Sequence, residues 1–245
     1  MKPIIWSYGG GTQSVAIAIL IAKGLLPVPD RIVFADTGGE MSEVWDYLHT
    51  FVEPLLLSVG RHVEIASHDL ATVDLYGHNG DLLIPAYTTG GKLPTFCSKE
   101  WKTYVVRRHL GGEKTIGQCV MWLGMSTDEV ERLKPADVQW IEHRWPLCFD
   151  APMNRVECRQ LVLNYGWPDP PKSACVWCPH LQDAEWRRMK EYAPADFARA
   201  VVRDREIRKH DTVWLHKARR PLDEVDLSKD EQPSLFGCDT GYCWT

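Results

Sequence analysis

The chain has 245 residues, of which 44% are hydrophobic and 25% are charged, and its net charge is −5. This composition excludes a disordered chain, and the negative net charge argues against a protein coated with positive charge for nucleic acid. The apolar run at residues 15–21 is too short to span a bilayer. We therefore expect a cytoplasmic protein without a membrane partner.

Strand-like and helix-like stretches alternate through the first two-thirds of the chain. Strands are predicted at residues 4–8, 31–35, 61–66 and 119–124, and helices at residues 14–23, 41–57 and 98–110. Such alternation predicts an α/β fold, in which a parallel sheet carries helices on both faces. Residues 76–94 lack periodicity and predict a long loop over the site.

Three regions are expected along the chain. They are an α/β domain over residues 1–150, a smaller helical region with cysteines over residues 151–220, and an acidic tail over residues 221–245. Residues 181–220 hold eleven Lys and Arg against seven Asp and Glu, whereas residues 221–245 hold one against six. This distribution is typical of a solvated helical face that precedes an acidic tail.

Three consecutive glycines join the first predicted strand to the first predicted helix. Glycine costs conformational entropy on folding, so this run indicates a sharp bend or a close approach to a ligand. The first N–H groups of a helix lack intrahelical partners, and the turn therefore predicts a phosphate site, with an ordinary tight turn as the alternative. The expected binding residues are Gly9, Gly10, Gly11, Thr12, Gln13 and Ser14. We expect Gly10→Val to abolish binding without unfolding the sheet.

A second polar loop follows the second predicted strand, where the chain reads DTGGE at residues 36–40. Ligands of parallel α/β sheets bind at the carboxyl ends of the strands. We therefore expect Asp36, Thr37 and Gly38 to contribute to the same site as the glycines. As a carboxylate at a strand end, Asp36 suits Mg²⁺ or a ribose better than a phosphate.

Five motifs carry a resemblance to a known family. GGGTQS at residues 9–14 resembles the PP-loop of the adenine-nucleotide alpha-hydrolase superfamily, usually Ser-Gly-Gly-x-Asp-Ser, with Gln13 in the Asp position. The other four are similar to stretches of its phosphoadenosine phosphosulfate (PAPS) reductase family: FADTGGE at 34–40, GMSTDEVER at 124–132, RWPL at 144–147 and KSACVWCPH at 172–180. The resemblance implies a Rossmann-like domain that binds an adenine nucleotide, ATP or PAPS/APS, with chemistry at its α-phosphate or sulfate.

Four of the eight cysteines are expected to bind one metal centre: Cys97, Cys158, Cys175 and Cys178. Many cysteines in a cytoplasmic chain are more typical of ligands or redox groups than of disulfides. Four thiolates suffice for a [4Fe–4S] cluster or a structural zinc, and spacing does not choose between these metals. The resemblance favours the cluster. Cys119 and Cys148 are expected in the core.

Several positive side chains are candidates to neutralise charge on the nucleotide or the leaving group. They are Lys99, Lys102, Arg107, His143 and Arg144. Transfer at phosphorus relies mainly on positioning and electrostatics, so we expect Lys99 and Arg144 to act in catalysis. The solvated face of a helix is the alternative for any single one of them.

Two further cysteines, Cys238 and Cys243, lie in the tail and are candidate catalytic thiols. Sulfonucleotide reductases resemble this arrangement, because they carry a nucleophilic cysteine near the carboxyl terminus, although their Glu-Cys-Gly-Leu-His signature is absent here. An extra metal pair or a docked tail without a catalytic role is the alternative.

Three functions remain open at this stage. The favoured one is ATP-dependent activation and thiolation of a nucleobase or nucleic-acid acceptor with a sulfur donor, because the chain has no Cys-Cys dipeptide of the kind that typical cluster-containing reductases carry. The second is a PAPS or APS reductase that releases sulfite and needs a thiol reductant protein. The third is a nucleotide-binding module with a structural zinc. The acceptor and the oligomeric state are not identified by the sequence.

Overall fold

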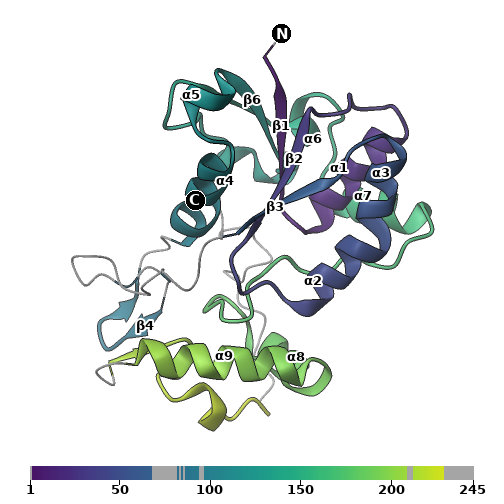
Figure 1. Cartoon of the computed structure of the whole chain (residues 1–245). Helices are drawn as coiled ribbons and strands as arrows, with labels where there is room; N and C mark the ends of the chain where they lie inside the picture. Colours follow the sequence, from purple (N-terminus) through teal and green to yellow (C-terminus); the bar gives the residue numbers. More distant parts are fainter. Residues whose placement is uncertain are drawn as a thin grey trace. The chain divides into compact units, whose positions relative to one another are not determined.

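A computed structural model describes residues 2–67, 82, 84, 86–93, 97–208 and 212–228 (Figure 1). The chain divides into two compact units. Unit 1 comprises Met1–Thr37, Glu43–His68 and Lys102–Ser173, and unit 2 comprises Gly38–Ser42, Asp69–Trp101 and Ala174–Thr245. Unit 1 thus extends past residue 150, and unit 2 takes in segments from the first half of the chain.

Unit 1 contains a five-stranded sheet with the order β3-β2-β1-β6-β7, and every neighbouring pair is parallel. The strands are β1 (Ile4–Tyr8), β2 (Arg31–Asp36), β3 (Val63–Ser67), β6 (Cys119–Leu123) and β7 (Ile141–Arg144). This confirms the predicted parallel sheet. The strand β7 was not predicted, because its sequence IEHR is too polar to read as a buried strand.

Helices cover both faces of the sheet, as predicted. Helix α1 (Thr12–Ala22) is buried almost all round and packs against α7 (Arg155–Asn164) and α3 (Glu53–Ser58). Helix α4 (Tyr104–His109) contacts β2 and β3, and Figure 1 shows it on the side of the sheet opposite α1. Alternate strand residues such as Val33, Ala35 and Met121 pack with Val105 and Val106 of α4 in one cluster.

The remaining helical segments of unit 1 are short. They are α2 (Ser42–Tyr47), the π-helical η1 (Leu48–Val52), α5 (Glu113–Ile116), the 3₁₀ segment η3 (Thr127–Arg132) and α6 (Pro146–Phe149). The single helix predicted over residues 41–57 is therefore a continuous helical stretch with a π-helical middle. The helix predicted over residues 98–110 likewise contains the π-helical η2 (Lys99–Thr103), followed by α4.

Unit 2 is built on two packed helices, α8 (Asp183–Tyr192) and α9 (Pro194–Ile207), with the 3₁₀ turn η4 (Leu222–Glu224). A three-stranded antiparallel sheet has the order β5-β4-β8, formed by β5 (Gly91–Lys92), β4 (Tyr87–Thr88) and β8 (Val213–Trp214). The expected loop over residues 76–94 is thus a hairpin at its described end. No helix among the described residues is long and apolar enough to cross a membrane.

Candidate functional site

The glycine turn lies at the carboxyl end of β1, the central strand of the unit 1 sheet. Gly10 has a φ of 74°, and Gly11 is the N-cap of α1 in an extended conformation (φ −104°, ψ −178°). No described side chain caps this helix, and its first turn carries no acidic residue. The first N–H groups of α1 are therefore available to an anion, which the positive end of the helix dipole also favours.

Hydrogen bonds inside the turn fix its shape. The N–H of Gly9 donates to Oγ of Ser14 at 2.9 Å, and Ser14 is only 4% exposed. Oγ of Ser173 donates to the carbonyl of Gly9. A Cβ placed on Gly124 would lie 3.1 Å from Oγ of Ser14, so the glycine after β6 leaves room for this hydroxyl. Ser14 therefore holds the turn closed, which is a structural task beyond the phosphate contact that the sequence predicted.

The structure corrects the expectation for Gly10→Val. A Cβ on Gly10 would lie 2.9 Å from Cγ1 of Val44 and 3.4 Å from Cε2 of Phe34. The space beside Gly10 is therefore filled by the protein's own core, and its positive φ is unfavourable for any residue with a Cβ. Valine at this position would disturb the packing of the turn as well as any bound phosphate.

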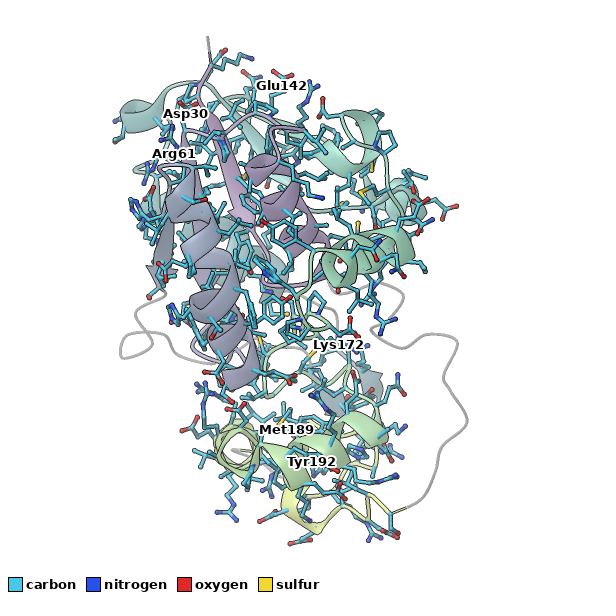
Figure 2. All side chains as sticks on the ribbon, turned by 90° about the vertical axis from the view of Figure 1, so that its right-hand side faces the viewer. Asp30, Arg61, Glu142, Lys172, Met189 and Tyr192 are labelled. Atoms are coloured by element: carbon cyan, nitrogen blue, oxygen red, sulfur yellow. The ribbon has the colours of Figure 1, made fainter. Side chains whose placement is uncertain are left out.

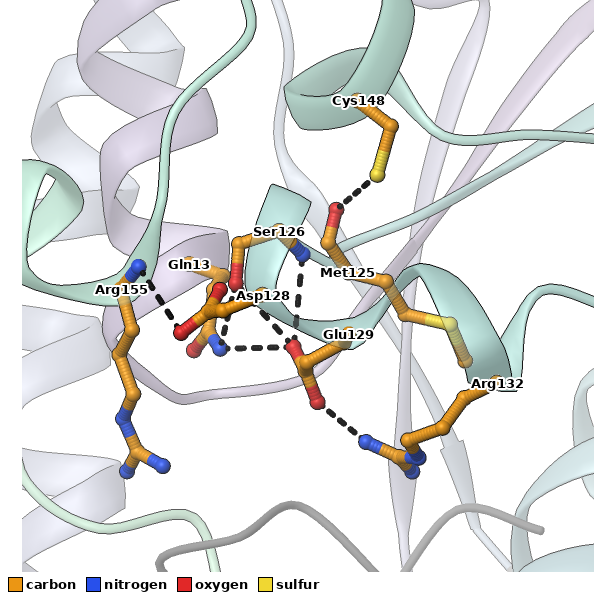
Figure 3. Close-up of polar contacts among 8 residues, drawn as sticks. All are labelled: Gln13, Met125, Ser126, Asp128, Glu129, Arg132, Cys148 and Arg155. Atoms are coloured by element: carbon orange, nitrogen blue, oxygen red, sulfur yellow. Dashed lines mark hydrogen bonds and ion pairs between the residues drawn. The ribbon is translucent and has the colours of Figure 1, made fainter.

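A polar network joins the turn to the segment after β6 (Figure 3). Nε2 of Gln13 donates to Oε2 of Glu129 at 3.0 Å and to Oγ of Ser126 at 3.4 Å. Ser126 is fully buried and forms a capping box with Glu129 at the start of η3. Gln13 occupies the position at which the PP-loop motif has Asp. Its side-chain amide donates a hydrogen bond to a carboxylate, that of Glu129.

Arg132 completes this network by pairing with Glu129. The side chain of Arg132 is only 10% exposed, and its Nε and Nη2 atoms are buried without a hydrogen-bond partner among the described residues. An unpaired buried donor costs about 1–3 kcal/mol, and more when the group is charged. Sequence reasoning assigned no role to Ser126, Glu129 or Arg132, although the spacing Ser-x-x-Glu in residues 126–129 is the signature of a capping box.

The second polar loop begins at the same edge of the sheet as the glycine turn. Tyr8 of β1 is in register with Phe34 of β2, so Asp36 lies two residues further along β2 toward its carboxyl end. Thr37 follows and is 2% exposed. This geometry places Asp36 and the glycine turn at neighbouring strand ends of unit 1. Gly38, the third expected residue of this loop, belongs to unit 2 and has a φ of 71°.

Lys172 is a cation that sequence reasoning did not single out. It directly precedes Ser173, whose hydroxyl binds the glycine turn. Within unit 1, Figure 2 shows Lys172 at the end opposite Asp30, Arg61 and Glu142. Since Asp30 and Arg61 precede β2 and β3, Lys172 lies toward the carboxyl ends of the strands. In the motif KSACVWCPH, the residue that contacts the glycine turn within unit 1 is Ser173, and no cysteine of the motif belongs to this unit.

The expected catalytic cations have structural partners. Arg144 ends β7 and forms an ion pair with Asp150, with Nε to Oδ2 at 2.8 Å. Nδ1 of His143 bonds the carbonyl of Lys134, and burial lowers the pKa of His143. Arg107 pairs with Asp137. These contacts favour the structural alternative for Arg107 and leave Arg144, whose side chain is half exposed, as a candidate.

The two remaining candidate cations, Lys99 and Lys102, belong to different units. Lys99 lies in the π-helical η2 and belongs to unit 2, whereas Lys102 lies in the same segment but belongs to unit 1. Both have interaction partners in the structure. A catalytic role for Lys99 therefore stays a prediction.

The four expected metal ligands are divided between the two units of the chain. Cys158 is fully buried in α7 of unit 1, whereas Cys97, Cys175 and Cys178 belong to unit 2. Burial raises the pKa of the Cys158 thiol to about 12, which opposes its ionisation. Among the described residues, no group of three or more His, Cys, Asp or Glu side chains is arranged to hold a metal ion. The four-thiolate centre therefore stays a prediction.

The other cysteines divide into core residues and undescribed ones. Cys119 is fully buried in β6, and burial raises the pKa of its thiol. Sγ of Cys148 lies 3.4 Å from the carbonyl oxygen of Met125. Cys119 is thus a core residue as predicted, while Cys148 is half-buried. Cys238 and Cys243 lie outside the described residues.

Comparison with known proteins finds similarity among solved structures. No protein-family model matches the chain, and no curated protein matches it. Among solved structures, the chain is similar to phosphoadenylyl-sulfate (PAPS) reductase from Candida auris, determined as a phosphate complex. The alignment has a TM-score of 0.43 and 12% sequence identity, and it covers 69% of this chain and 76% of that one.

Proposed function

We propose that the chain is a PP-loop enzyme that binds an adenine nucleotide on the Gly9–Ser14 turn and activates an acceptor by attack at the α-phosphate of ATP. The observation that carries this proposal is the uncapped start of α1 at the end of the central strand β1. Asp36 at the neighbouring strand end supports it, because a carboxylate there can hold the Mg²⁺ that accompanies ATP.

The residues of the turn act by positioning and by charge stabilisation. The N–H groups of Gly11, Thr12 and Gln13 bind phosphate oxygens and hold the α-phosphorus in line with the acceptor. An acceptor oxygen attacks this phosphorus, the bond to the β-phosphate oxygen breaks, and pyrophosphate leaves. Charge builds up on the leaving group, and Arg132, with two buried donor atoms that have no described partner, is suited to an anion next to the turn.

Sulfur transfer completes the proposed reaction. A hydrosulfide supplied by a donor protein attacks the activated carbon of the acceptor, and AMP leaves with the oxygen that formed the first bond. The product is a thiolated nucleobase or nucleic acid. No residue of this chain is assigned to the sulfur.

The reductase remains the second candidate, since the tail carries Cys238 and Cys243. In that reaction, a cysteine thiolate attacks the sulfur of PAPS or APS, the adenosine phosphate leaves, and a thiol reductant then releases sulfite. This route needs the tail and never produces pyrophosphate.

A product assay distinguishes the two candidates. The protein is incubated with ATP, Mg²⁺, total cellular RNA and sodium sulfide as the hydrosulfide source in one reaction, and with PAPS, APS and dithiothreitol in another, while pyrophosphate, AMP and sulfite are measured. We expect pyrophosphate and AMP in equal amounts in the first reaction, also after deletion of residues 237–245. Thiol-dependent sulfite from the intact protein alone, without pyrophosphate, would establish the reductase. Nucleotide binding without pyrophosphate, AMP or sulfite formation would favour the third function, a nucleotide-binding module without enzymatic activity.

A further inference from the structure

Unit 2 contains a pocket along helix α9 that no residue of the glycine turn lines. Its volume is about 360 Å³, and its walls are Gly38, Trp177, Ala195, Ala198, Arg199, Val202, Arg203 and Glu206. Sites for small molecules have volumes of about 300–1,000 Å³. The pocket is therefore large enough for one small ligand or one unit of a polymer, and too small for a folded partner.

One arginine of the pocket is held rigidly by the main chain of residues 38–42. The guanidinium of Arg199 donates to the carbonyl of Gly38 at 2.9 Å and to that of Glu40 at 3.2 Å, and it pairs with Asp196 at 2.9 Å. Asp196 is almost completely buried, and its other oxygen accepts from both N–H and Oγ of Ser42 at 2.8 Å. Arg199 therefore presents its charge to the pocket in a fixed orientation.

The second arginine is held by an aromatic ring. Cζ of Arg203 lies 4.5 Å from the centre of the Trp177 ring, and Nη1 of Arg203 bonds Glu206 at 2.8 Å. The indole of Trp177 lies so close to Gly39 that a Cβ on that glycine would overlap the ring. The N–H of Val176 also donates to the carbonyl of Gly39 at 2.6 Å, which fixes the turn that carries Trp177. The platform for Arg203 is therefore preformed.

The chemistry of these walls selects the ligand class. A guanidinium group has five N–H donors, and the described residues accept three bonds from Arg199 and one from Arg203. The remaining donors, one helical turn apart, suit an anion with several oxygens, such as a phosphate. The guanidinium plane of Arg203 and the half-exposed Val202 suit a flat base, as in proteins that bind single strands.

We propose that this pocket binds one nucleotide unit of a single-stranded nucleic acid, with its phosphate on Arg199 and Arg203 and its base against Arg203 and Val202. The excess of Lys and Arg over Asp and Glu in residues 181–220 agrees with a polyanionic partner. The inference rests on the proposed function in one respect, because it makes the acceptor a nucleic acid and not a free nucleobase.

The test is a fluorescence-anisotropy titration of the full chain with a labelled single-stranded RNA of mixed sequence, in the absence of ATP. Arg203→Ala removes the guanidinium group that would contact both the phosphate and the base. Val202→Glu places a carboxylate in the pocket at a position that is exposed. Arg205→Ala is the matched control, because Arg205 lies on the same helix, pairs with Asp223 and does not line the pocket. Circular dichroism and thermal unfolding verify that each variant is folded.

We expect both pocket variants to bind the RNA about tenfold more weakly, and Arg205→Ala to bind like the unmodified protein. Loss of one phosphate contact in Arg203→Ala should also reduce the slope of log K against log salt concentration by about 0.7. No RNA binding, equal binding by all variants, or displacement of the RNA by an acidic peptide as effectively as by unlabelled RNA would overturn the inference.

ATP affinity, measured separately, distinguishes the failure of this inference from the failure of the proposed function. If ATP binds normally and the RNA affinity is unchanged in the pocket variants, only the assignment of the pocket is wrong. If the RNA affinity falls in the pocket variants but the chain does not bind ATP, the proposed function is wrong and the nucleic-acid site stands.

Discussion

Nε2 of Gln13 donates a hydrogen bond to Oε2 of Glu129 at 3.0 Å, and this bond ties the first turn of α1 to the segment after β6. Glu129 is at the same time paired with Arg132 and bonded by Ser126, so one carboxylate holds η3 together and links it to α1 beside the glycine turn. Asp and Glu at this position would have no N–H donor for the carboxylate of Glu129, and the side chain of Asn would be shorter. Among these four residue types, only Gln combines an N–H donor with the observed side-chain length. The residue that departs from the PP-loop pattern is thereby explained by its partner.

Gln13→Glu should weaken the structure at this point, because it replaces the donor with a carboxylate that faces Glu129. We expect a loss of about 1–3 kcal/mol in the free energy of unfolding and about tenfold weaker ATP binding. The double variant Gln13→Glu with Glu129→Gln exchanges donor and acceptor and should recover most of the loss. Thermal unfolding and calorimetry of the three variants measure this coupling, and additive effects would show that the two side chains act independently.

Substitutions at Gly10 and Gly11 should differ in kind. Gly10→Ala is expected to destabilise the protein by about 1–3 kcal/mol, because of its positive φ and its contact with Val44. Gly11 has an ordinary φ, and a Cβ there would lie 3.3 Å from Cβ of Ser173, so the fold should tolerate alanine after Ser173 shifts by a few tenths of an ångström. We expect Gly11→Ala to lose ATP affinity in calorimetry while its unfolding midpoint stays close to that of the unmodified protein. A large loss of stability in Gly11→Ala would show that the turn is too tightly packed for this comparison.

The sequence predicts the central sheet well because its signals are local. The apolar strand β1, the glycines after it and the apolar helix α1 follow one another directly, and so do β2 and the polar residues from Asp36 onward. The network around Glu129 depends on a contact across 116 positions, which no local pattern reveals. The contact that a Cβ on Gly10 would make with Val44 likewise depends on packing between distant residues. It contradicts the prediction that valine at position 10 would abolish binding without disturbing the fold.

The grouping of the cysteines is harder to predict, because spacing fixes only neighbours along the chain. Cys175 and Cys178 can face one metal wherever their turn lies, but Cys158 is 17 positions upstream and is buried in α7. Burial of this kind follows from the helix packing and leaves no trace in the spacing of the cysteines.

Metal analysis of three variants tests this distinction. We expect Cys178→Ala to lose most bound iron or zinc, while Cys158→Ala and the core variant Cys119→Ser retain it. Metal content is measured by mass spectrometry on protein purified without oxygen, together with its absorption spectrum. Loss of metal in Cys158→Ala equal to that in Cys178→Ala would show that the four-cysteine centre forms after all.

Glu64 should make the stability depend on acid pH. Its hydrogen bond from Nε of Arg31 at 2.8 Å, opposed by burial and aided by His109, lowers the pKa of Glu64 from 4.5 to about 2. The folded state therefore holds the carboxylate more strongly than the unfolded state, so this stabilisation is present above pH 4.5 and is lost as pH falls toward 2.

Denaturant unfolding at a series of pH values measures this effect. Glu64→Gln should flatten the decline in the free energy of unfolding over that range by an amount on the order of 1 kcal/mol. Glu142→Gln is the control, because Glu142 forms an exposed ion pair with Lys2. Identical pH profiles for the Glu64 variant and the unmodified protein would contradict the assigned pKa.

The central claim is that the N–H groups at the start of α1 bind the phosphates of an adenine nucleotide. Backbone amide NMR measures this directly, by titrating the ¹⁵N-labelled chain with Mg²⁺-ATP and, separately, with PAPS. We expect the largest shifts on Gly9, Gly11, Thr12 and Gln13, and we expect them to saturate at one equivalent of nucleotide. Saturation with shifts confined to other residues, or no shift with either nucleotide, would contradict it.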